Sequence, residues 1–368
     1  MKKIIFGITS LTLGGAERVL VDMVNQLSDT FDITIFTIYG KGELEKSLNN
    51  RIKIKRIFDK PYKELTKFEK ISIPLKILCF QKQYYKKYIQ GDYDIEIAFL
   101  EGPITRLFST KNRNTKKIAW IHNDISKVYG NDLKAKLKLT IDKRIYNKYE
   151  KLIFVSKDNK EVFDIRYPNM KPTEEVIYNY IDPQKVIEKA KEKIDFSFDN
   201  KQMSFLTVAR LVEQKGIDRL IRIHKELIAN HFNNKFYIIG DGPEREKLEK
   251  LIKDEHLQET FFLLGAKENP YPYIKQADMF CLLSKFEGYG MVLEEAKILN
   301  KPIIITNTAA REAVKNYKNA VIVENDEHEI YNKLKYIIEN NTKTFDDKKQ
   351  IYDNHHIIKE LEKLLKEE

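Results

Sequence analysis

Two glutamate residues, Glu287 and Glu295, frame a glycine loop in the last third of the chain. The apolar run 279–283 in front of this loop is typical of a buried parallel strand, and the segment behind it has helical spacing. Gly288 and Gly290 let the backbone turn tightly between the two. A helix that begins at such a loop offers unpaired N–H groups and a partial positive charge to a phosphate group.

Two cations, Arg210 and Lys215, form a second candidate group after the apolar run 204–208. Gly216 follows and begins another segment with helical spacing. Isolated basic residues are usually solvated, but these two lie between a predicted buried strand and a helix, where parallel sheets bind ligands. Two cations at such a place can neutralise a diphosphate that gains charge as it leaves.

The spacing from Glu287 to Glu295, beginning with Glu-Gly-Tyr-Gly, resembles the donor-site motif of the family 4 glycosyltransferases. The segment with Arg210 and Lys215 resembles the arginine–lysine segment of the same family, and the resemblance covers nearly the whole chain. It implies an α/β fold of GT-B architecture, with two doubly wound Rossmann-like domains facing each other across a cleft. It also implies metal-independent, retaining transfer of a hexosyl or N-acetylhexosaminyl group from a nucleotide sugar, with UDP as the expected nucleotide. The expected acceptor is a lipid-linked saccharide in bacterial capsular, exo- or lipopolysaccharide synthesis.

The resemblance assigns roles to individual residues. Glu287 is expected to orient the sugar, Arg210 and Lys215 to stabilise the leaving diphosphate, and His122 to contact donor sugar or acceptor. These four are the predicted catalytic residues, and none of them identifies itself as a nucleophile or a base. The expected donor-binding residues lie in glycine loops and at the start of one helix: Gly14, Gly15, Gly265, Gly288, Tyr289, Gly290, Met291, Val292, Leu293 and Glu295.

Two of these assignments also have a structural interpretation. His122 follows the predicted strand 117–121, and a lone histidine after a strand is often structural. The loop with Gly14 and Gly15 follows the predicted strand 3–9 and could be an ordinary loop before a helix. A dinucleotide oxidoreductase is disfavoured, because this loop lacks the G-x-G-x-x-G fingerprint.

The elements that must position these residues follow the order of a doubly wound parallel sheet twice. The first seven strands are expected at 3–9, 33–38, 52–57, 95–99, 117–121, 152–155 and 175–178. Six more are expected at 204–208, 236–239, 261–267, 279–283, 302–306 and 321–323. The expected domains are an acceptor domain at 1–182, a hinge at 183–202, a donor domain at 203–344 and a helix at 345–368 that returns to the acceptor domain.

Composition places the chain among soluble globular proteins. It has 368 residues, of which 42% are hydrophobic and 33% charged, and no apolar run approaches the roughly 20 residues of a membrane span. The two cysteines, Cys79 and Cys281, fall in different halves and suggest neither a disulfide framework nor a zinc site. We expect a cytoplasmic protein at the inner face of the plasma membrane.

Basic residues are concentrated in the region 51–90, which holds 12 basic and 3 acidic residues. A helix after Pro74 is expected to carry lysines on one side and apolar residues on another: Leu75, Ile77, Leu78, Phe80, Tyr84, Tyr85, Tyr88 and Ile89. Such a helix could bind an anionic membrane surface, or it could pack on the sheet with its lysines extended into water. Nucleic acid is disfavoured as a partner, because no recognition motif accompanies the basic region.

The pair Asp92 and Asp94 could suggest a metal site, since D-x-D pairs hold divalent metals in another glycosyltransferase architecture. The pair leads directly into the predicted strand 95–99, which favours a turn, and we expect neither a metal nor a cofactor. Two other functions stay open. One is a non-catalytic subunit that partners an active transferase, and the other is a sugar-nucleotide epimerase of similar architecture.

Overall fold

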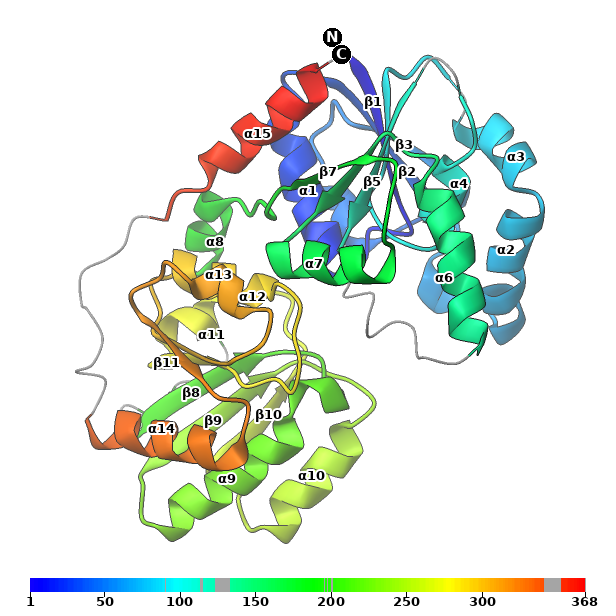
Figure 1. The fold of residues 1–368 in the computed structure, drawn as a ribbon. Helices are drawn as coiled ribbons and strands as arrows, with labels where there is room; N and C mark the ends of the chain where they lie inside the picture. The colour runs from blue at the N-terminus through cyan, green and yellow to red at the C-terminus, as the bar shows by residue number, and fades with distance from the viewer. Residues whose placement is uncertain are drawn as a thin grey trace. The chain divides into compact units, whose positions relative to one another are not determined.

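The computed structural model describes residues 1–89, 91–112, 115–122, 133–194, 196, 198–199, 201–340 and 352–367, with only the backbone at 133–137. The chain forms two compact units. The first consists of Met1–Ile181 and Asp353–Glu368, and the second of Asp182–Tyr352. Each unit is a parallel β-sheet covered by helices, as Figure 1 shows.

The sheet of the first unit has seven strands in the order β3-β2-β1-β4-β5-β6-β7, and every neighbouring pair is parallel. The order reverses between β1 and β4, which is the place where doubly wound sheets bind ligands at their carboxyl edge. The strands are β1 (Lys3–Ile8), β2 (Asp32–Tyr39), β3 (Lys53–Phe58), β4 (Ile95–Ala98), β5 (Lys116–Ile121), β6 (Lys151–Phe154) and β7 (Thr173–Val176).

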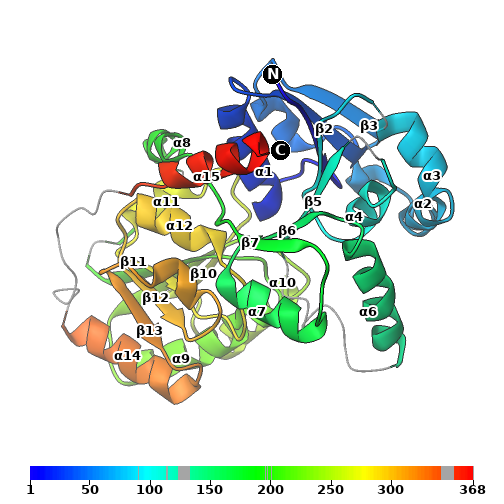
Figure 2. The ribbon, with the colours of Figure 1, turned by 45° about the horizontal axis from the view of Figure 1, so that its top comes forward.

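Helices cover both faces of this sheet. One core face packs against α2, α4, α6 and α7, while α1 packs against α15. The helices are α1 (Gly15–Leu27), α2 (Lys67–Cys79), α3 (Gln81–Tyr84), α4 (Pro103–Phe108), α6 (Leu133–Tyr146), α7 (Lys157–Arg166) and α15 (His355–Lys366), with short turns η1 (Glu43–Ser47), η2 (Tyr62–Glu64) and η3 (Tyr85–Ile89). Figure 2 shows α15 beside α1, and Lys2 Nζ donates to Lys366 O at 3.0 Å near the start of the chain.

Helix α2 begins earlier than expected. Thr66 caps it, because Thr66 Oγ1 accepts from Glu69 N (3.2 Å) while Glu69 Oε2 accepts from Thr66 N (2.7 Å). This capping box fixes the start at Lys67, so that Pro74 lies inside the helix and not in front of it.

The single apolar face predicted for this region is wrong. Ile77, Tyr85 and Ile89 are buried in the core, whereas Leu75 and Leu78 are exposed. The predicted set therefore divides between two sides already within α2, where Leu75 and Leu78 are three residues apart on the exposed side and Ile77 lies on the other. The π-turn at η3 then changes the helical phase again.

The sheet of the second unit has six strands in the order β10-β9-β8-β11-β12-β13, again all parallel. The strands are β8 (Met203–Val208), β9 (Asn234–Ile239), β10 (Phe261–Gly265), β11 (Met279–Leu282), β12 (Ile303–Thr306) and β13 (Ala320–Val323). The helices are α8 (Pro183–Lys189), α9 (Ile217–Ala229), α10 (Arg245–Asp254), α11 (Tyr271–Gln276), α12 (Met291–Ile298), α13 (Arg311–Val314) and α14 (Glu327–Glu339), with the turn η4 (Glu213–Lys215). In Figure 1, α9, α10 and α14 cover one face, and α11, α12 and α13 lie on the other.

Every expected strand is present, with ends shifted by no more than two residues. The structure thus confirms the α/β class and the two Rossmann-like sheets. Residues 183–202 were expected to be a linker, but they begin with α8, which Asp182 caps by accepting from Gln184 N at 3.0 Å. The expected helix 345–368 corresponds to α15, while 345–351 and 368 lie outside the described residues.

Candidate active site

The carboxylate of Glu287 lies in the loop after β11 and is held by two side chains. Lys215 Nζ is 2.5 Å from Glu287 Oε2, and Ser284 Oγ donates to the same oxygen at 3.1 Å. Glu287 is only 8% exposed. The ion pair therefore places a largely buried carboxylate and a cation side by side at the carboxyl edge of the sheet.

The two loops that carry this pair follow neighbouring strands, β8 and β11, and are bonded to each other. Gln214 Nε2 donates to Phe286 O (3.1 Å), and Lys285 N donates to Gln214 O (2.9 Å). Arg219, in the first turns of α9, donates to Leu283 O at 2.8 Å. These bonds fix the distance between Lys215 and Glu287 through the backbone.

Arg210 lies next to this pair in sequence but has an exposed side chain and makes no ion pair within the described part of the chain. Its backbone is supported by the glycine turn after β9. A Cβ atom at Gly240 would lie 1.8 Å from Ala209 O, and one at Gly242 would lie 2.4 Å from Leu211 O. Only glycine permits this approach, so the turn holds the Arg210 segment in place and leaves its guanidinium group available to a ligand.

Helix α12 begins at the glycine loop with backbone N–H groups that point out of the helix. Gly290 has a φ of 72°, and a Cβ atom there would lie 3.2 Å from Leu282 and Leu293 side chains. The N–H groups of Gly290, Met291 and Val292 have no hydrogen-bond acceptor among the residues described. Leu293 is also among the expected donor-binding residues, but its N–H is not available to a ligand, because it donates to Gly290 O at 2.9 Å.

Glu295 is 7% exposed on the next turn of α12, and Tyr271 of α11 donates to its Oε1 at 3.2 Å. Gly265 ends β10 on the same edge with a φ of 74°. Three strand spacings separate β10 from β11, or about 14 Å, which is comparable to the length of an extended nucleoside diphosphate. The second unit therefore brings together on one edge all the predicted donor residues that belong to it.

The remaining predicted residues, Gly14, Gly15 and His122, lie at the carboxyl edge of the first sheet. The glycines follow β1 and His122 follows β5, with β4 between them. Sequence reasoning missed Glu101 after β4, whose Oε1 accepts from His122 N at 2.7 Å. Glu101 precedes Gly102, which has a φ of 88°. A polar residue and a glycine directly after a predicted strand could therefore have identified Glu101 from the sequence.

Two titratable groups at this edge have shifted pKa values. Burial lowers the pKa of His122 to about 3, and a hydrogen bond to the backbone of Phe99 only partly opposes this shift. Burial raises the pKa of Glu17, in the first turn of α1, while a backbone hydrogen bond lowers it. His122 is therefore neutral near pH 7 and can donate or accept a hydrogen bond without a charge.

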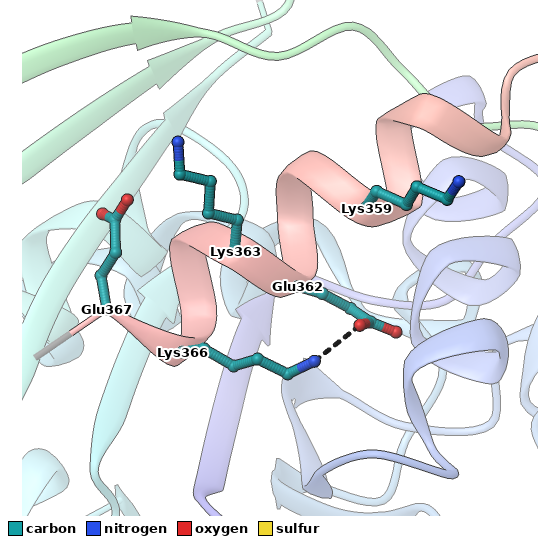
Figure 3. Close-up of a pocket in the computed structure, with 5 residues that line it drawn as sticks. All are labelled: Lys359, Glu362, Lys363, Lys366 and Glu367. Carbon is teal, nitrogen blue, oxygen red and sulfur yellow. Dashed lines mark hydrogen bonds and ion pairs between the residues drawn. The ribbon is translucent and has the colours of Figure 1, made fainter.

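Two hollows formed by described residues lie away from these edges. One of about 480 Å³ is lined by Lys359, Glu362, Lys363, Lys366 and Glu367, whose side chains spread apart in Figure 3 except for the Lys366–Glu362 pair. Lys2, before β1, and Lys116, at the start of β5, donate to backbone oxygens at this end of α15. The hollow therefore lies at the amino edge of the first sheet, opposite the edge described above.

Asp94 has a structural role, since its Oδ2 accepts from Lys3 N at 2.7 Å and joins the start of β1 to that of β4. Among the described residues, no helix combines the length and the apolar character needed to cross a membrane.

Comparison with known proteins identifies relatives of the chain. The sequence profile of the family described as "Glycosyl transferases group 1" matches residues 188–355. An uncharacterized glycosyltransferase of Methanocaldococcus jannaschii is 28% identical over 298 residues, which are 78% of this chain and 71% of that protein. The N-acetylgalactosamine-N,N'-diacetylbacillosaminyl-diphospho-undecaprenol 4-alpha-N-acetylgalactosaminyltransferase of Campylobacter jejuni is 27% identical over 355 residues, 92% of this chain and 91% of that protein. Among solved structures, Anabaena HepE in complex with UDP and glucose has a TM-score of 0.75 and 18% identity, and 99% of each chain is covered.

Proposed function

Since the chain belongs to the group 1 glycosyltransferases, a retaining family with the GT-B fold, we propose that it transfers a sugar from UDP to a hydroxyl group of a lipid-linked saccharide. The product would be part of a bacterial surface polysaccharide. The observation that carries the proposal is the carboxyl edge of the second sheet. There the Lys215–Glu287 pair, the unpaired Arg210 and the free N–H groups of 290–292 lie on loops fixed to one another.

Each part of this edge has a chemical task. The bond between the anomeric carbon and the diphosphate oxygen breaks, and negative charge builds up on the leaving diphosphate. Arg210, Lys215 and the N–H groups at the start of α12 stabilise that charge, and each such preorganised donor contributes on the order of 10² to 10³ in rate. Glu287 accepts hydrogen bonds from the sugar hydroxyls, and Glu295 accepts from the ribose.

The identity of the donor and of the acceptor is supported by what is known of relatives. HepE of Anabaena was crystallised with UDP and glucose and with UDP-glucose, and the name of the Campylobacter enzyme states that it acts on a diphospho-undecaprenol saccharide. We therefore choose UDP among the nucleotides and an undecaprenyl-type saccharide among the acceptors.

A thermal-shift panel with UDP, GDP, ADP, CMP and NAD, with and without magnesium, tests the donor site. A ligand present at 100 times its Kd adds about 2.7 kcal/mol of stability, which raises Tm measurably. We expect a shift with UDP that does not need magnesium. Arg210→Ala should abolish it, while Arg222→Ala, which removes a surface pair with Glu327, should keep it.

Three outcomes would contradict the proposal. If no nucleoside diphosphate raises Tm, the donor site is wrong and a non-catalytic subunit becomes the better interpretation. If another nucleotide raises Tm more than UDP does, that nucleotide and not UDP is part of the donor. Conversion of the sugar nucleotide without any acceptor would favour an epimerase.

We also propose that the chain acts at the inner face of the plasma membrane and that α2 is its contact with lipid. Phe68, Ile71, Leu75 and Leu78 are 75%, 66%, 54% and 47% exposed, and their spacing of three and four residues places them on one side of the helix. The opposite side carries Ile73 and Ile77, which pack into the core. A helix needs only one apolar side to pack on its own sheet, so the second is left for another apolar surface.

Charge around this outer side favours an anionic bilayer. Lys67 and Lys76 of α2 and Lys82, Lys86 and Lys87 just after it are all exposed. The nearby Glu69 is neutralised by Lys60, whose Nζ is 3.0 Å from it. Lysines near an anionic surface contribute about 1 kcal/mol each, and insertion of apolar side chains adds to this attraction.

Sedimentation with vesicles tests this contact. Binding to vesicles with 30% phosphatidylglycerol is expected to exceed binding to pure phosphatidylcholine, and to weaken in Phe68→Ser/Leu75→Ser. The matched control is Ile165→Ser, which removes an equally exposed apolar residue (79%) from α7. Equal binding of the double variant and the control would exclude α2 as the lipid contact.

A further inference from the structure

The buried carboxylate of Glu294 has no part in the proposed transfer, yet three side chains donate to it. Tyr289 Oη donates to its Oε1 at 2.8 Å, and Tyr352 Oη donates to its Oε2 at 2.7 Å. Lys297 Nζ lies 2.9 Å from one oxygen and 2.8 Å from the other. With 3% exposure, Glu294 thus has both oxygens occupied and little access to water.

The two tyrosines come from places with different roles. Tyr289 lies between Gly288 and Gly290 in the loop that follows Glu287, whereas Tyr352 is the last residue of the second unit before the chain enters the first. Lys297 also holds Glu294 and Tyr352 together. Its Nζ donates to Ala313 O (2.6 Å) and lies 5.5 Å from the Tyr352 ring centroid.

The chain segment that follows Tyr352 is held by a hydrogen bond. Asn354, two residues further on and 2% exposed, donates to Ile181 O at 2.7 Å. Ile181 is the last residue of the first unit before the chain enters the second, so the two crossings of the chain are joined by one hydrogen bond. After the first crossing comes α8, which packs against α12.

We propose that Glu294 is a positioning residue that fastens the glycine loop, through Tyr289, to the second chain crossing, through Tyr352, and thereby sets donor affinity. The proposal rests on the proposed function, since it concerns the same donor loop. A loop with two glycines has many accessible conformations, and a tether to Tyr289 removes some of them before the donor binds. Loss of the tether should therefore weaken donor binding more than it slows the chemical step.

Tyr352→Phe is the cleanest test, because it deletes one hydroxyl group outside the donor loop. We expect the donor KM and the Kd for UDP to rise about fivefold, the effect of one lost hydrogen bond, while kcat stays within about twofold. The matched control is Tyr317→Phe, which deletes a hydroxyl that donates to Lys301 O at 2.9 Å in the same unit but has no bond to the loop. The control should lose similar stability and keep KM.

Two further measurements separate positioning from a general loss of structure. Hydrogen exchange of the amides at 285–292 should speed up in Tyr352→Phe and not in Tyr317→Phe. In Tyr289→Phe/Tyr352→Phe the rise in KM should be smaller than the product of the two single effects, because both act through Glu294.

Equal KM, Kd and exchange in Tyr352→Phe and Tyr317→Phe would overturn the proposal. This failure differs from failure of the proposed function, in which the unaltered protein itself would bind no nucleoside diphosphate.

Discussion

Two lysine–glutamate pairs of low exposure, Lys117–Glu96 in the first unit and Lys215–Glu287 in the second, differ in their place on the sheet. In the first unit, Lys117 Nζ lies 2.5 Å from Glu96 Oε2, and the two residues are direct neighbours on β4 and β5. In the second unit, Lys215 lies at the same distance from Glu287, but both residues follow the ends of their strands. Glu96 is fully buried, while the side chains of Lys215 and Glu287 keep 17% and 10% of their surface.

Their surroundings explain the difference. Glu96 also accepts from Tyr85 Oη (2.5 Å), and Lys117 also donates to Phe108 O (2.8 Å), so that the pair is enclosed by structural partners. Burial lowers the pKa of Lys117, and Glu96 opposes that shift. Lys215 and Glu287 instead lie in the loops after β8 and β11, which also carry Arg210 and lead into α12. The same chemical pair is almost fully enclosed within the strands and keeps part of its surface exposed beyond their ends.

The largest expected effect is on stability in the first unit. Lys117→Met leaves Glu96 buried without its cation, and the free energy of unfolding should fall by about 3 to 5 kcal/mol. Urea unfolding monitored by circular dichroism measures this. The double variant Glu96→Met/Lys117→Met should be more stable than Lys117→Met, because it leaves no unpaired charge in the core. A double variant with a lower free energy of unfolding than Lys117→Met would contradict the role of the buried charge.

The corresponding change in the second unit should affect catalysis. Lys215→Met removes a cation from the proposed diphosphate site, and kcat should fall on the order of 10² to 10³. The free energy of unfolding should fall by less than in Lys117→Met, because Lys215 and Glu287 keep part of their surface in water. Steady-state transfer assays and the same urea titration measure both quantities. A variant that loses as much stability as Lys117→Met, with normal activity, would show that both pairs are structural.

For histidine, the buried residue lies in the second unit and the residue at the sheet edge in the first. The buried histidine should make stability depend on pH. His224 is fully buried under the second sheet, and burial lowers its pKa to about 3, whereas His122 lies at the carboxyl edge of the first. Because the unfolded chain binds a proton near pH 6.5 and the folded one does not, this stability is present above pH 6.5 and is lost as pH falls toward 3. Between pH 7 and 5 the loss from one such histidine is about 2 kcal/mol.

His224→Phe should flatten this slope, as measured by urea unfolding at each pH. The variant keeps an aromatic ring between Phe236 and Phe261, whose centroids lie 5.1 Å and 5.7 Å from that of His224. An unchanged slope would assign the acid sensitivity to other groups.

The smallest expected effect compares two glycines of positive φ, one in each unit. Gly290→Ala and Gly102→Ala should each cost about 1 kcal/mol of stability from backbone strain. Gly290→Ala should also weaken UDP binding, since a Cβ there meets Leu282 and Leu293 at 3.2 Å, whereas Gly102 has open space around it. Calorimetric titration with UDP distinguishes them, and equal affinities would argue against a role for the Gly290 turn.

The sequence by itself determined the strands and the residues that we propose for the donor site. Apolar runs followed by glycines define β8 and β11, and the motifs after them contain Arg210, Lys215, Glu287 and Glu295 within short stretches of chain. Local spacing was sufficient because the strands that carry them, β8 and β11, are neighbours in a parallel sheet. Nucleotide-binding roles for these residues stay predictions.

Only the tertiary structure decided which polar residues meet from distant positions. The pairs Glu96–Lys117 and His122–Glu101 depend on strand order, and the contact of Glu294 with Tyr352 joins residues 58 positions apart. The two apolar sides of α2 were hidden as well, because the sequence prediction began the helix after Pro74 and so left out Phe68, Ile71 and Ile73. A capping box at Thr66, and not the proline at 74, decides where α2 starts.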